Sequence, residues 1–346
     1  MPAALAAQGR LAVALLAGSG RVRRLARGAR VEETQLGGVP ASVFRPAGAM
    51  GARPALLVVP GVTRRGRKHP GFIAVGEGLA AAGFVVAVVE PPGLAIGELT
   101  LRTIDDTQAA AEELAAMHER VALAGVSGGA TVALAVAAQP SIADRISAVA
   151  ALAPCCDVRA GLRLVTTSRY RPDSAPFDTG PFFRLVIARS AIAWLRDRPD
   201  SRALREHVLG LEDYGPEPLR AFRSWPTEDL TPEARAVVHL LGNTDPERFD
   251  VLYAQLTDEQ RRAAELLSPV LAARSIRAQV ELVVAQEDKY IPLEDAIAFT
   301  HECPRARLTV VESLEHAVPS VSLAAARDLG RLDAAAVRFL AASYSA

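Results

Sequence analysis

One serine lies where its hydroxyl could act as a nucleophile. The apolar run 121–124 leads directly into the pattern Gly-Val-Ser-Gly-Gly at 125–129, and small residues at 130–138 follow with a helical pattern. A strand, a sharp turn and a helix in this order project the serine away from the sheet, and glycines permit the close packing of such a turn. The helix start also places free backbone N–H groups beside the hydroxyl. Ser127 is therefore the candidate nucleophile for acyl transfer, provided that a base lies elsewhere in the chain.

A serine hydroxyl needs a base that removes its proton and a third group that orients the base. The sequence contains six histidines. His316 alone lies in a loop just after a predicted strand, 307–311, near the C-terminus. The other histidines lie in a basic loop, in predicted helices or in the long insertion described below. We therefore predict that His316 is the base.

The orienting carboxylate is expected just after an earlier parallel strand, because ligand sites gather at the carboxyl ends of such strands. Asp288 fits this expectation, since it follows the predicted strand 279–285. Its neighbour Glu287 is the first alternative, and Asp157, after the strand 146–153, is the second. The pattern favours Asp288 as the acid, with Glu287 as a surface charge in the loop and Asp157 as a helix cap.

These residues need a framework, and most of the chain predicts alternating strands and helices. The continuous apolar runs are typical of parallel strands that are buried on both faces. A Gly-Gly turn between two alternating segments predicts an antiparallel hairpin over 31–46. The predicted strands are 31–35, 41–45, 55–59, 84–89, 121–124, 146–153, 279–285 and 307–311, and the predicted core helices include 72–82, 103–119, 130–138, 293–301 and 333–344. This order indicates an α/β fold with a mostly parallel, doubly wound sheet.

The alternation stops between about residues 157 and 275. This stretch is charged, contains prolines and is mostly helical in pattern, with no convincing buried strand. A connection between neighbouring strands is normally far shorter. We therefore predict a core formed by 31–156 and 276–346, and an inserted helical cap subdomain over 157–275. Residues 1–30 are predicted to form an N-terminal helical segment packed on the body of the protein, with peripheral membrane contact as the alternative.

Composition argues against several classes of partner. Lys+Arg and Asp+Glu are equal at 39 each among 346 residues, so no global field favours nucleic acid or an anionic membrane. The three cysteines show neither a metal-binding spacing nor a disulfide framework, which favours a reducing compartment. The first 20 residues are apolar, but the arginines follow this run instead of preceding it, unlike a secretory signal. A cytoplasmic location is therefore expected.

These residues together carry a resemblance to the α/β-hydrolase superfamily, in its esterase/lipase-like branch with a helical cap. The pattern at 125–129 resembles the nucleophile elbow of that family, and Asp288 and His316 complete its order of Ser, Asp and His. The resemblance covers about 31–156 and 276–346. It implies a serine hydrolase that forms an acyl-enzyme on a small-molecule ester or acyl substrate with an apolar part, without a cofactor or a metal.

The resemblance also implies an oxyanion hole. One donor is the backbone N–H of Gly128, the residue after the serine, and the other comes from the loop that follows the strand 55–59. Val62 is the donor expected by position, with Thr63 as the alternative. This sequence has Pro60 where the family often has histidine, but the chemistry depends on the amide and not on that side chain.

Two other functions remain open at this point. An acyltransferase would use the same three residues, with an alcohol, amine or thiol in place of water. A non-catalytic binding protein could also be built on this scaffold. The basic run 64–69, beside the expected oxyanion hole, could bind a carboxylate or phosphate, although a solvated loop is the simpler interpretation. The insertion matches no pattern that names the substrate, and the sequence does not indicate the oligomeric state.

Overall fold

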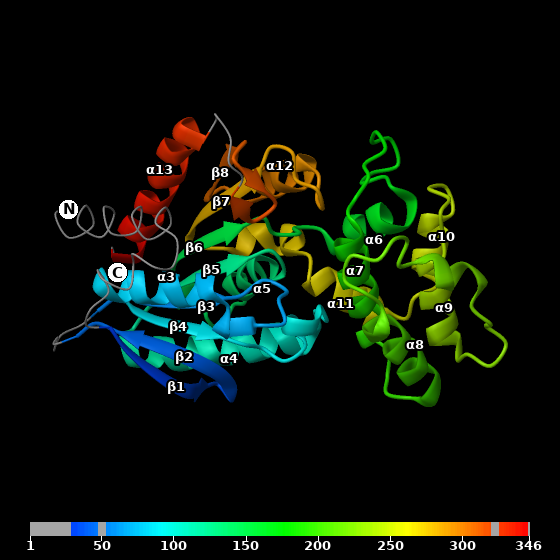
Figure 1. The fold of residues 1–346 in the computed structure, drawn as a ribbon, viewed down its shortest axis with the longest axis horizontal. Helices are drawn as coiled ribbons and strands as arrows, with labels where there is room; N and C mark the ends of the chain where they lie inside the picture. Colours follow the sequence, from blue (N-terminus) through cyan, green and yellow to red (C-terminus); the bar gives the residue numbers. More distant parts are fainter. Residues whose placement is uncertain (1–28, 48–52, 320–324, 345–346) are drawn as a thin grey trace.

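The computed structural model describes residues 29–47, 53–319 and 325–344. The predicted N-terminal helical segment therefore lies almost entirely outside the described residues. Figure 1 shows a central sheet flanked by helices, and the sheet has eight strands in the order β1-β2-β4-β3-β5-β6-β7-β8. The strands are β1 Arg30–Leu36, β2 Val39–Arg45, β3 Ala55–Val59, β4 Val85–Val89, β5 Val121–Val126, β6 Ile146–Leu152, β7 Gln279–Ala285 and β8 Ala306–Val311, with a separate two-stranded ribbon of β9 Leu314–Glu315 and β10 Val318–Pro319.

The strands that consist of apolar residues run parallel in the sheet, as their composition predicts. β3 and β4 consist only of apolar residues and are buried throughout, as expected where helices cover both faces of a sheet. All neighbouring strands from β4 to β8 are parallel. β2 pairs antiparallel with both β1 and β4. The predicted α/β class with a mostly parallel sheet is confirmed.

β1 and β2 form the predicted hairpin at one edge of the sheet. Gly37 and Gly38 occupy its turn with φ of 55° and 79°, a region that glycine adopts without steric cost. A Cβ at Gly37 would lie 2.4 Å from the backbone of Ala109. The helix that carries Ala109 therefore packs directly against the turn.

Helices cover both faces of the sheet. α3 (Pro70–Ala81) and α13 (Ala325–Tyr344) pack on one face, where Leu79 and Phe339 share a buried cluster with residues of β3 and β4. α4 (Leu101–His118), α5 (Gly128–Ala137) and α12 (Leu293–Glu302) pack on the other face. Short 3-10 helices lie in the connections, at η1 Gly66–Lys68, η2 Leu94–Ile96 and η3 Ala143–Arg145.

α13 is longer than the sequence pattern predicts, since it begins at Ala325 and not near residue 333. The Asp328 carboxylate accepts hydrogen bonds from the backbone N–H groups of Glu312 (2.7 Å) and Ser313 (2.6 Å). These contacts fix the start of the helix on the segment that follows β8. They offset the cost of about 1 kcal/mol that Gly330 imposes inside a helix.

Between β6 and β7 the chain forms a helical insertion, drawn to the right of the sheet in Figure 1. Every residue of this stretch is described, and none of them is in a strand. Its backbone returns to the point of departure, because Val270 N–H donates to the Cys156 carbonyl at 3.0 Å. The elements of the insertion are α6 Val158–Thr167, α7 Pro181–Ala193, α8 Pro199–Gly210, η4 Arg220–Ser224, α9 Pro232–Leu241, α10 Phe249–Ala254, α11 Asp258–Leu266 and η5 Pro269–Ser275.

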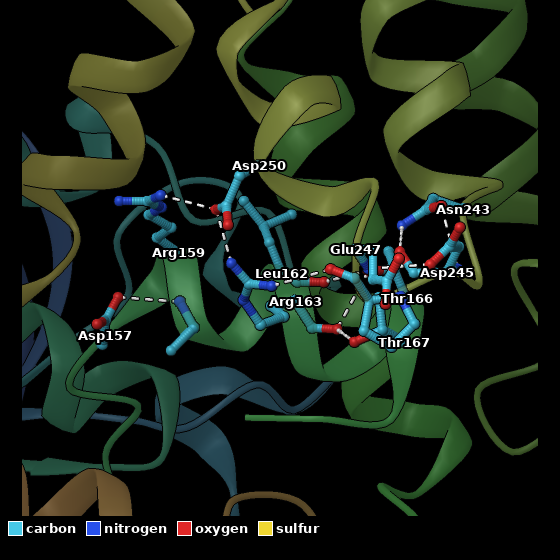
Figure 2. Close-up of polar contacts among 12 residues, drawn as sticks. Asp157, Arg159, Leu162, Arg163, Thr166, Thr167, Asn243, Asp245, Glu247 and Asp250 are labelled. Carbon is cyan, nitrogen blue, oxygen red and sulfur yellow. Dashed lines mark hydrogen bonds and ion pairs between the residues drawn. The ribbon is translucent and has the colours of Figure 1, made fainter. Parts of the chain in front are cut away.

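Charged side chains join α6 to α10 inside the insertion, as Figure 2 shows. The Asp250 carboxylate accepts hydrogen bonds from Arg163 at 2.6 Å and Arg159 at 2.9 Å. Arg163 is buried and also donates to the Pro246 carbonyl at 3.2 Å. Its guanidinium lies over the Phe249 ring, 4.3 Å from the centroid. The insertion thus has its own internal packing in addition to its contacts with the core.

A buried carboxylate of α12 binds the backbone at the point where the insertion leaves the core. Asp295 accepts hydrogen bonds from the backbone N–H groups of Cys156 (2.7 Å) and Asp157 (3.1 Å). It also accepts one from the Tyr170 hydroxyl at 2.8 Å. Burial raises the pKa of this carboxyl to about 6. Cys155 and Cys156 are buried beside it, as expected of small core residues at a strand end.

Over the described ranges, none of the helices combines the length and the apolar character that crossing a membrane requires. The expected cytoplasmic location and the membrane alternative for residues 1–30 both stay predictions.

Candidate active site

Ser127 lies at the turn between β5 and α5, as the sequence predicts. Its backbone has φ 52° and ψ −124°, a strained conformation for a residue with a Cβ. A Cβ at Gly125 would lie 2.4 Å from the Gly129 carbonyl oxygen, and one at Gly129 would lie 2.1 Å from the Pro60 carbonyl oxygen. Both positions therefore exclude any side chain. The close approach of strand, turn and helix explains why the pattern needs glycine on both sides of the serine.

His316 approaches Ser127 from the ribbon that follows β8. Its Nε2 lies 2.9 Å from Ser127 Oγ, and its Nδ1 lies 2.7 Å from Asp288 Oδ2. The residue is buried in the turn between β9 and β10, and its φ of 59° is uncommon for a residue with a Cβ. The structure brings together the serine, histidine and aspartate that the sequence pattern selects, although 189 and 28 residues separate His316 from Ser127 and Asp288.

Asp288 lies in the loop after β7, which we call the acid loop (residues 286–292). Its Oδ1 accepts hydrogen bonds from the backbone N–H groups of Tyr290 (2.8 Å) and Ile291 (3.2 Å). The second oxygen is thereby aimed at His316. The carboxyl is buried, with 8% of the residue exposed.

The two alternative carboxylates have other roles in the structure. Glu287 is exposed to solvent in the acid loop. Asp157 is the N-cap of α6, where its side chain accepts a hydrogen bond from Ala160 N–H at 3.0 Å. Both positions match the sequence interpretation of a surface charge and a helix cap. Only Asp288 among the three contacts a histidine in the described part of the chain.

The residues selected as amide donors lie beside Ser127. Gly128 is the first residue of α5, and Ala130 N–H and Thr131 N–H donate to the Ser127 carbonyl. The Gly128 amide precedes these two donors, at the helix start, where a backbone N–H has no carbonyl one turn earlier in the helix to bond to. A Cβ at Gly128 would lie 3.4 Å from Val62 Cγ2. The loop after β3 and the start of α5 thus meet next to the serine.

The helix α7 of the insertion crosses above this region. Ser190 Oγ accepts a hydrogen bond from Leu99 N–H at 3.0 Å, and Trp194 Nε1 donates to the Leu99 carbonyl at 2.9 Å. A Cβ at Gly97 would lie 3.2 Å from Val186 Cγ2 and 3.4 Å from Val62 Cγ1. α7 therefore places Val186 close to the loops that surround Ser127.

Aromatic rings border His316 on the other side. Tyr290 contacts the imidazole edge-to-face at 4.8 Å between ring centroids. Phe182, at the start of α7, lies 6.0 Å from the Tyr290 ring and stacks on Tyr214 at 5.5 Å. Burial raises the pKa of the Tyr290 phenol to about 12, so the ring stays neutral.

Sequence reasoning did not single out Phe182, Val186 or Tyr290. Phe182, Val186 and Ser190 follow one another at four-residue spacing, which puts them on one face of α7. That spacing could have indicated which face of the insertion meets the core, but not which part of the core it meets. Tyr290 is two residues after Asp288, and nothing in its surroundings distinguishes it from an ordinary core tyrosine.

The basic run 64–69 is largely engaged within the molecule. Arg64 pairs with Asp213 of the insertion at 3.3 Å. Arg67 pairs with Glu33 at 2.6 Å and Glu90 at 3.3 Å. His69 caps α3 by accepting a hydrogen bond from Gly71 N–H. These contacts favour a structural role for the run over the binding of an anionic ligand.

Comparison with solved structures identifies the fold, whereas comparison by sequence finds no relative. No protein-family model matches the sequence, and no curated protein matches it. Solved structures do match. Est1E from Butyrivibrio proteoclasticus has a TM-score of 0.51 and 15% identity, over 92% of this chain and 100% of the other. The candidate lipase lip1 from Acinetobacter baumannii AYE has a TM-score of 0.50 and 14% identity, over 94% and 95%.

Identities at this level concern the fold alone, because fold does not by itself imply function. The strand order, the turn that carries Ser127 and these structural matches agree with one another. The resemblance seen in the sequence is confirmed at the level of the fold: this chain has the α/β-hydrolase fold.

Proposed function

We propose that this protein is a serine hydrolase that cleaves a carboxylic ester or a related acyl bond through Ser127, His316 and Asp288. The observation that carries the proposal is the continuous pair of hydrogen bonds from Ser127 to His316 (2.9 Å) and from His316 to Asp288 (2.7 Å). The strained turn at Ser127 supports it, because backbone strain of this kind is found at functional sites.

In the first half of the proposed reaction, Ser127 Oγ attacks the carbonyl carbon of the substrate while His316 Nε2 takes the hydroxyl proton. The carbonyl oxygen becomes an oxyanion, and the Gly128 and Val62 amides act as its donors. Losing one such donor typically costs about 10²–10³ in rate. His316 then gives its proton to the leaving alcohol as the ester bond breaks, which leaves an acyl group on Ser127.

In the second half, water replaces the alcohol. His316 removes a proton from the water as its oxygen attacks the acyl carbon, and then returns the proton to Ser127 as the acid product leaves. Asp288 holds the imidazole in the required tautomer and stabilises its charged form in both halves. The two backbone N–H groups on Asp288 Oδ1 keep the other oxygen directed at His316.

The residues around Ser127 favour a substrate with an apolar part and without charge. Val62, Leu99 and Val186 lie on the oxyanion side of the serine, and Phe182 and Tyr290 lie on the histidine side. We propose that the insertion acts as a cap and that its helix α7 forms the roof of a substrate pocket beside Ser127. An apolar acyl chain or alcohol would gain about 25 cal/mol for each Å² that it removes from water there.

The test uses purified protein with short-chain p-nitrophenyl esters and a fluorophosphonate probe. We expect ester hydrolysis and stoichiometric labelling of the wild type, with the label mapped to Ser127 by mass spectrometry. Ser127→Ala should abolish both. If Ser127→Ala is labelled as well as the wild type, Ser127 is not the nucleophile. If p-nitrophenol is released only when an alcohol, amine or thiol is added, the acyl group passes to that acceptor and the enzyme is an acyltransferase.

A further inference from the structure

The insertion contacts the acid loop through its own backbone and one threonine. Thr179 Oγ1 donates a hydrogen bond to the Tyr290 carbonyl at 2.6 Å. The next residue, Gly180, donates its N–H to the Lys289 carbonyl at 2.9 Å. Gly180 is the N-cap of α7, so these two bonds attach the start of the roof helix to the residues that follow Asp288.

Thr179 is held firmly in this position. Its side chain is buried, with 1% of the residue exposed, and a buried hydroxyl needs a hydrogen-bond partner. Its own carbonyl accepts a hydrogen bond from Arg184 Nε at 3.2 Å. Arg184 also donates to the carbonyl of Val165 in α6. Arg184 of α7 thus links the threonine backbone to α6.

Gly180 leaves no space between the insertion and the acid loop. A Cβ at this position would lie 2.8 Å from Tyr290 Cε1 and 3.0 Å from Tyr290 Cδ1. Its backbone has φ −60° and ψ 150°, which any residue can adopt. The steric requirement at this position therefore comes only from the Tyr290 ring.

Tyr290 connects this contact to the reacting groups. Its backbone N–H donates to Asp288 Oδ1 at 2.8 Å, while its carbonyl receives the Thr179 hydroxyl. Its ring packs edge-to-face on His316 at 4.8 Å. A displacement of the Tyr290 backbone would therefore move both the donor that orients the carboxylate and the ring that borders the imidazole.

We propose that Thr179 is a positioning residue, which acts through the Tyr290 backbone to hold Asp288 and His316 in the geometry that proton transfer requires. The insertion then contributes to the rate of the chemical step, and not only to the enclosure of the substrate. This inference rests on the proposed function, since it assigns a role within the same site.

The test is Thr179→Val, which removes the hydroxyl and keeps the shape of the side chain. We expect kcat to fall roughly 10- to 100-fold, as a small displacement of reacting groups can cause, while KM changes less than about twofold because no substrate contact is removed. The acid limb of the pH–kcat/KM profile should move to lower pH, since a carboxylate held less firmly stabilises the protonated imidazole less. Thr179→Ser, which restores the hydroxyl, should recover most of the activity and the original profile.

Thr166→Val is the matched control. Thr166 is also a buried threonine of the insertion, at 6% exposure, but its hydroxyl donates to the carbonyls of Leu162 and Arg163 in its own helix. This variant loses a comparable hydrogen bond without touching the acid loop. Its kcat and pH profile should match those of the wild type, which separates positioning from general destabilisation.

Gly180→Ala provides a second test if Thr179→Val does not fold. It introduces a methyl group against the Tyr290 ring without backbone strain, and its kcat should also fall with KM retained. Wild-type kcat and an unchanged pH profile in a folded Thr179→Val or Gly180→Ala protein would overturn the inference. The proposed function would still stand if Ser127→Ala and Asp288→Asn were inactive in the same assay, and it would fail if they were as active as the wild type.

Discussion

The turn that carries Ser127 and the helical insertion above it are held in place by different kinds of contact. At the turn, backbone atoms approach so closely that Gly125 and Gly129 admit no side chain. Gly125 faces the backbone of Gly129 and Ala130 in the same turn, whereas Gly129 faces the Val59 and Pro60 carbonyls at the end of the neighbouring strand β3. The turn therefore has a single shape, which backbone contacts impose.

The insertion shares an apolar cluster with the core, and individual hydrogen bonds also attach it. Arg205 forms a bidentate pair with the buried Glu98 at 2.6 and 2.7 Å, and Tyr170 donates to Asp295. Trp194 and Thr179 donate to core carbonyls. Such bonds can be removed one at a time. We therefore predict that substitutions at the turn and at the three reacting residues cause a large loss of activity or stability, and that substitutions in the insertion cause a smaller, graded loss.

The largest effect on activity is expected from Asp288→Asn. An amide can still contact His316, but it no longer stabilises the charged imidazole and favours the wrong tautomer, so kcat should fall about 10⁴-fold. The matched control is Asp157→Asn, because asparagine caps a helix as well as aspartate. Steady-state hydrolysis of a p-nitrophenyl ester measures both. A greater loss in Asp157→Asn than in Asp288→Asn would assign the acid to the earlier strand.

The largest effect on folding is expected from Gly129→Ala. The new methyl group would have to occupy space 2.1 Å from the Pro60 carbonyl oxygen, so the turn must open and the free energy of unfolding should drop by about 4 kcal/mol or more. Gly330→Ala in α13 is the control, since a Cβ there meets nothing within 4 Å and should stabilise the helix by up to about 1 kcal/mol. Urea unfolding followed by circular dichroism gives both values, and equal stability of the two variants would contradict the steric argument.

The sequence predicted the part of the molecule that depends on local pattern. The turn at Ser127 follows from glycine spacing, and the sheet follows from runs of apolar residues, both of which are contiguous in the chain. The sequence pattern also favoured Asp288 as the acid, but Asp157 follows a parallel strand as well, and the contact between Asp288 and His316 is seen only in the structure. Thr179 and Tyr170 contact core residues that lie 111 and 125 positions away in the chain. No periodic pattern in the sequence indicates which residues so far apart are in contact. α13 was predicted too short because its start is stabilised by hydrogen bonds from Glu312 and Ser313, outside the helix, to Asp328 in its first turn.

A moderate effect with a clear pH dependence is expected from Tyr170→Phe. Burial raises the pKa of Asp295 to about 6, above the value of about 3.9 for an unfolded chain. The folded state therefore binds more protons than the unfolded state between about pH 4 and 6, and this carboxyl lowers stability as the pH rises through that range. Above it, the Tyr170 hydroxyl donates to a charged carboxylate, a bond worth about 1.5–3 kcal/mol.

Tyr170→Phe should therefore lose about 1.5–3 kcal/mol of unfolding free energy at pH 8, and less at pH 5, where the bond is to a neutral acid. Tyr253→Phe is the control, because Tyr253 is also a buried tyrosine of the insertion and its hydroxyl makes no hydrogen bond to any described residue. Urea unfolding at the two pH values measures the difference. An equal loss at pH 8 and pH 5 would show that Asp295 has the same charge at both.

The smallest effect is expected from Phe182→Ala, which tests whether the insertion shapes the pocket. Phe182 lies between Tyr290 and Tyr214, one helical turn before Val186, so its loss should weaken the binding of an apolar acyl chain by about 1–3 kcal/mol. Because this contact is made equally before and during the reaction, KM should rise about 5- to 100-fold for long acyl esters with kcat retained, and acetate esters should be little affected. Val251→Ala, an exposed apolar residue of α10 at 64% exposure, should leave both constants unchanged. A fall in kcat that is equal for short and long esters would mean that Phe182 supports the position of Tyr290 instead of contacting the substrate. In that case Val186 and the loop around Leu99 would form the roof of the pocket.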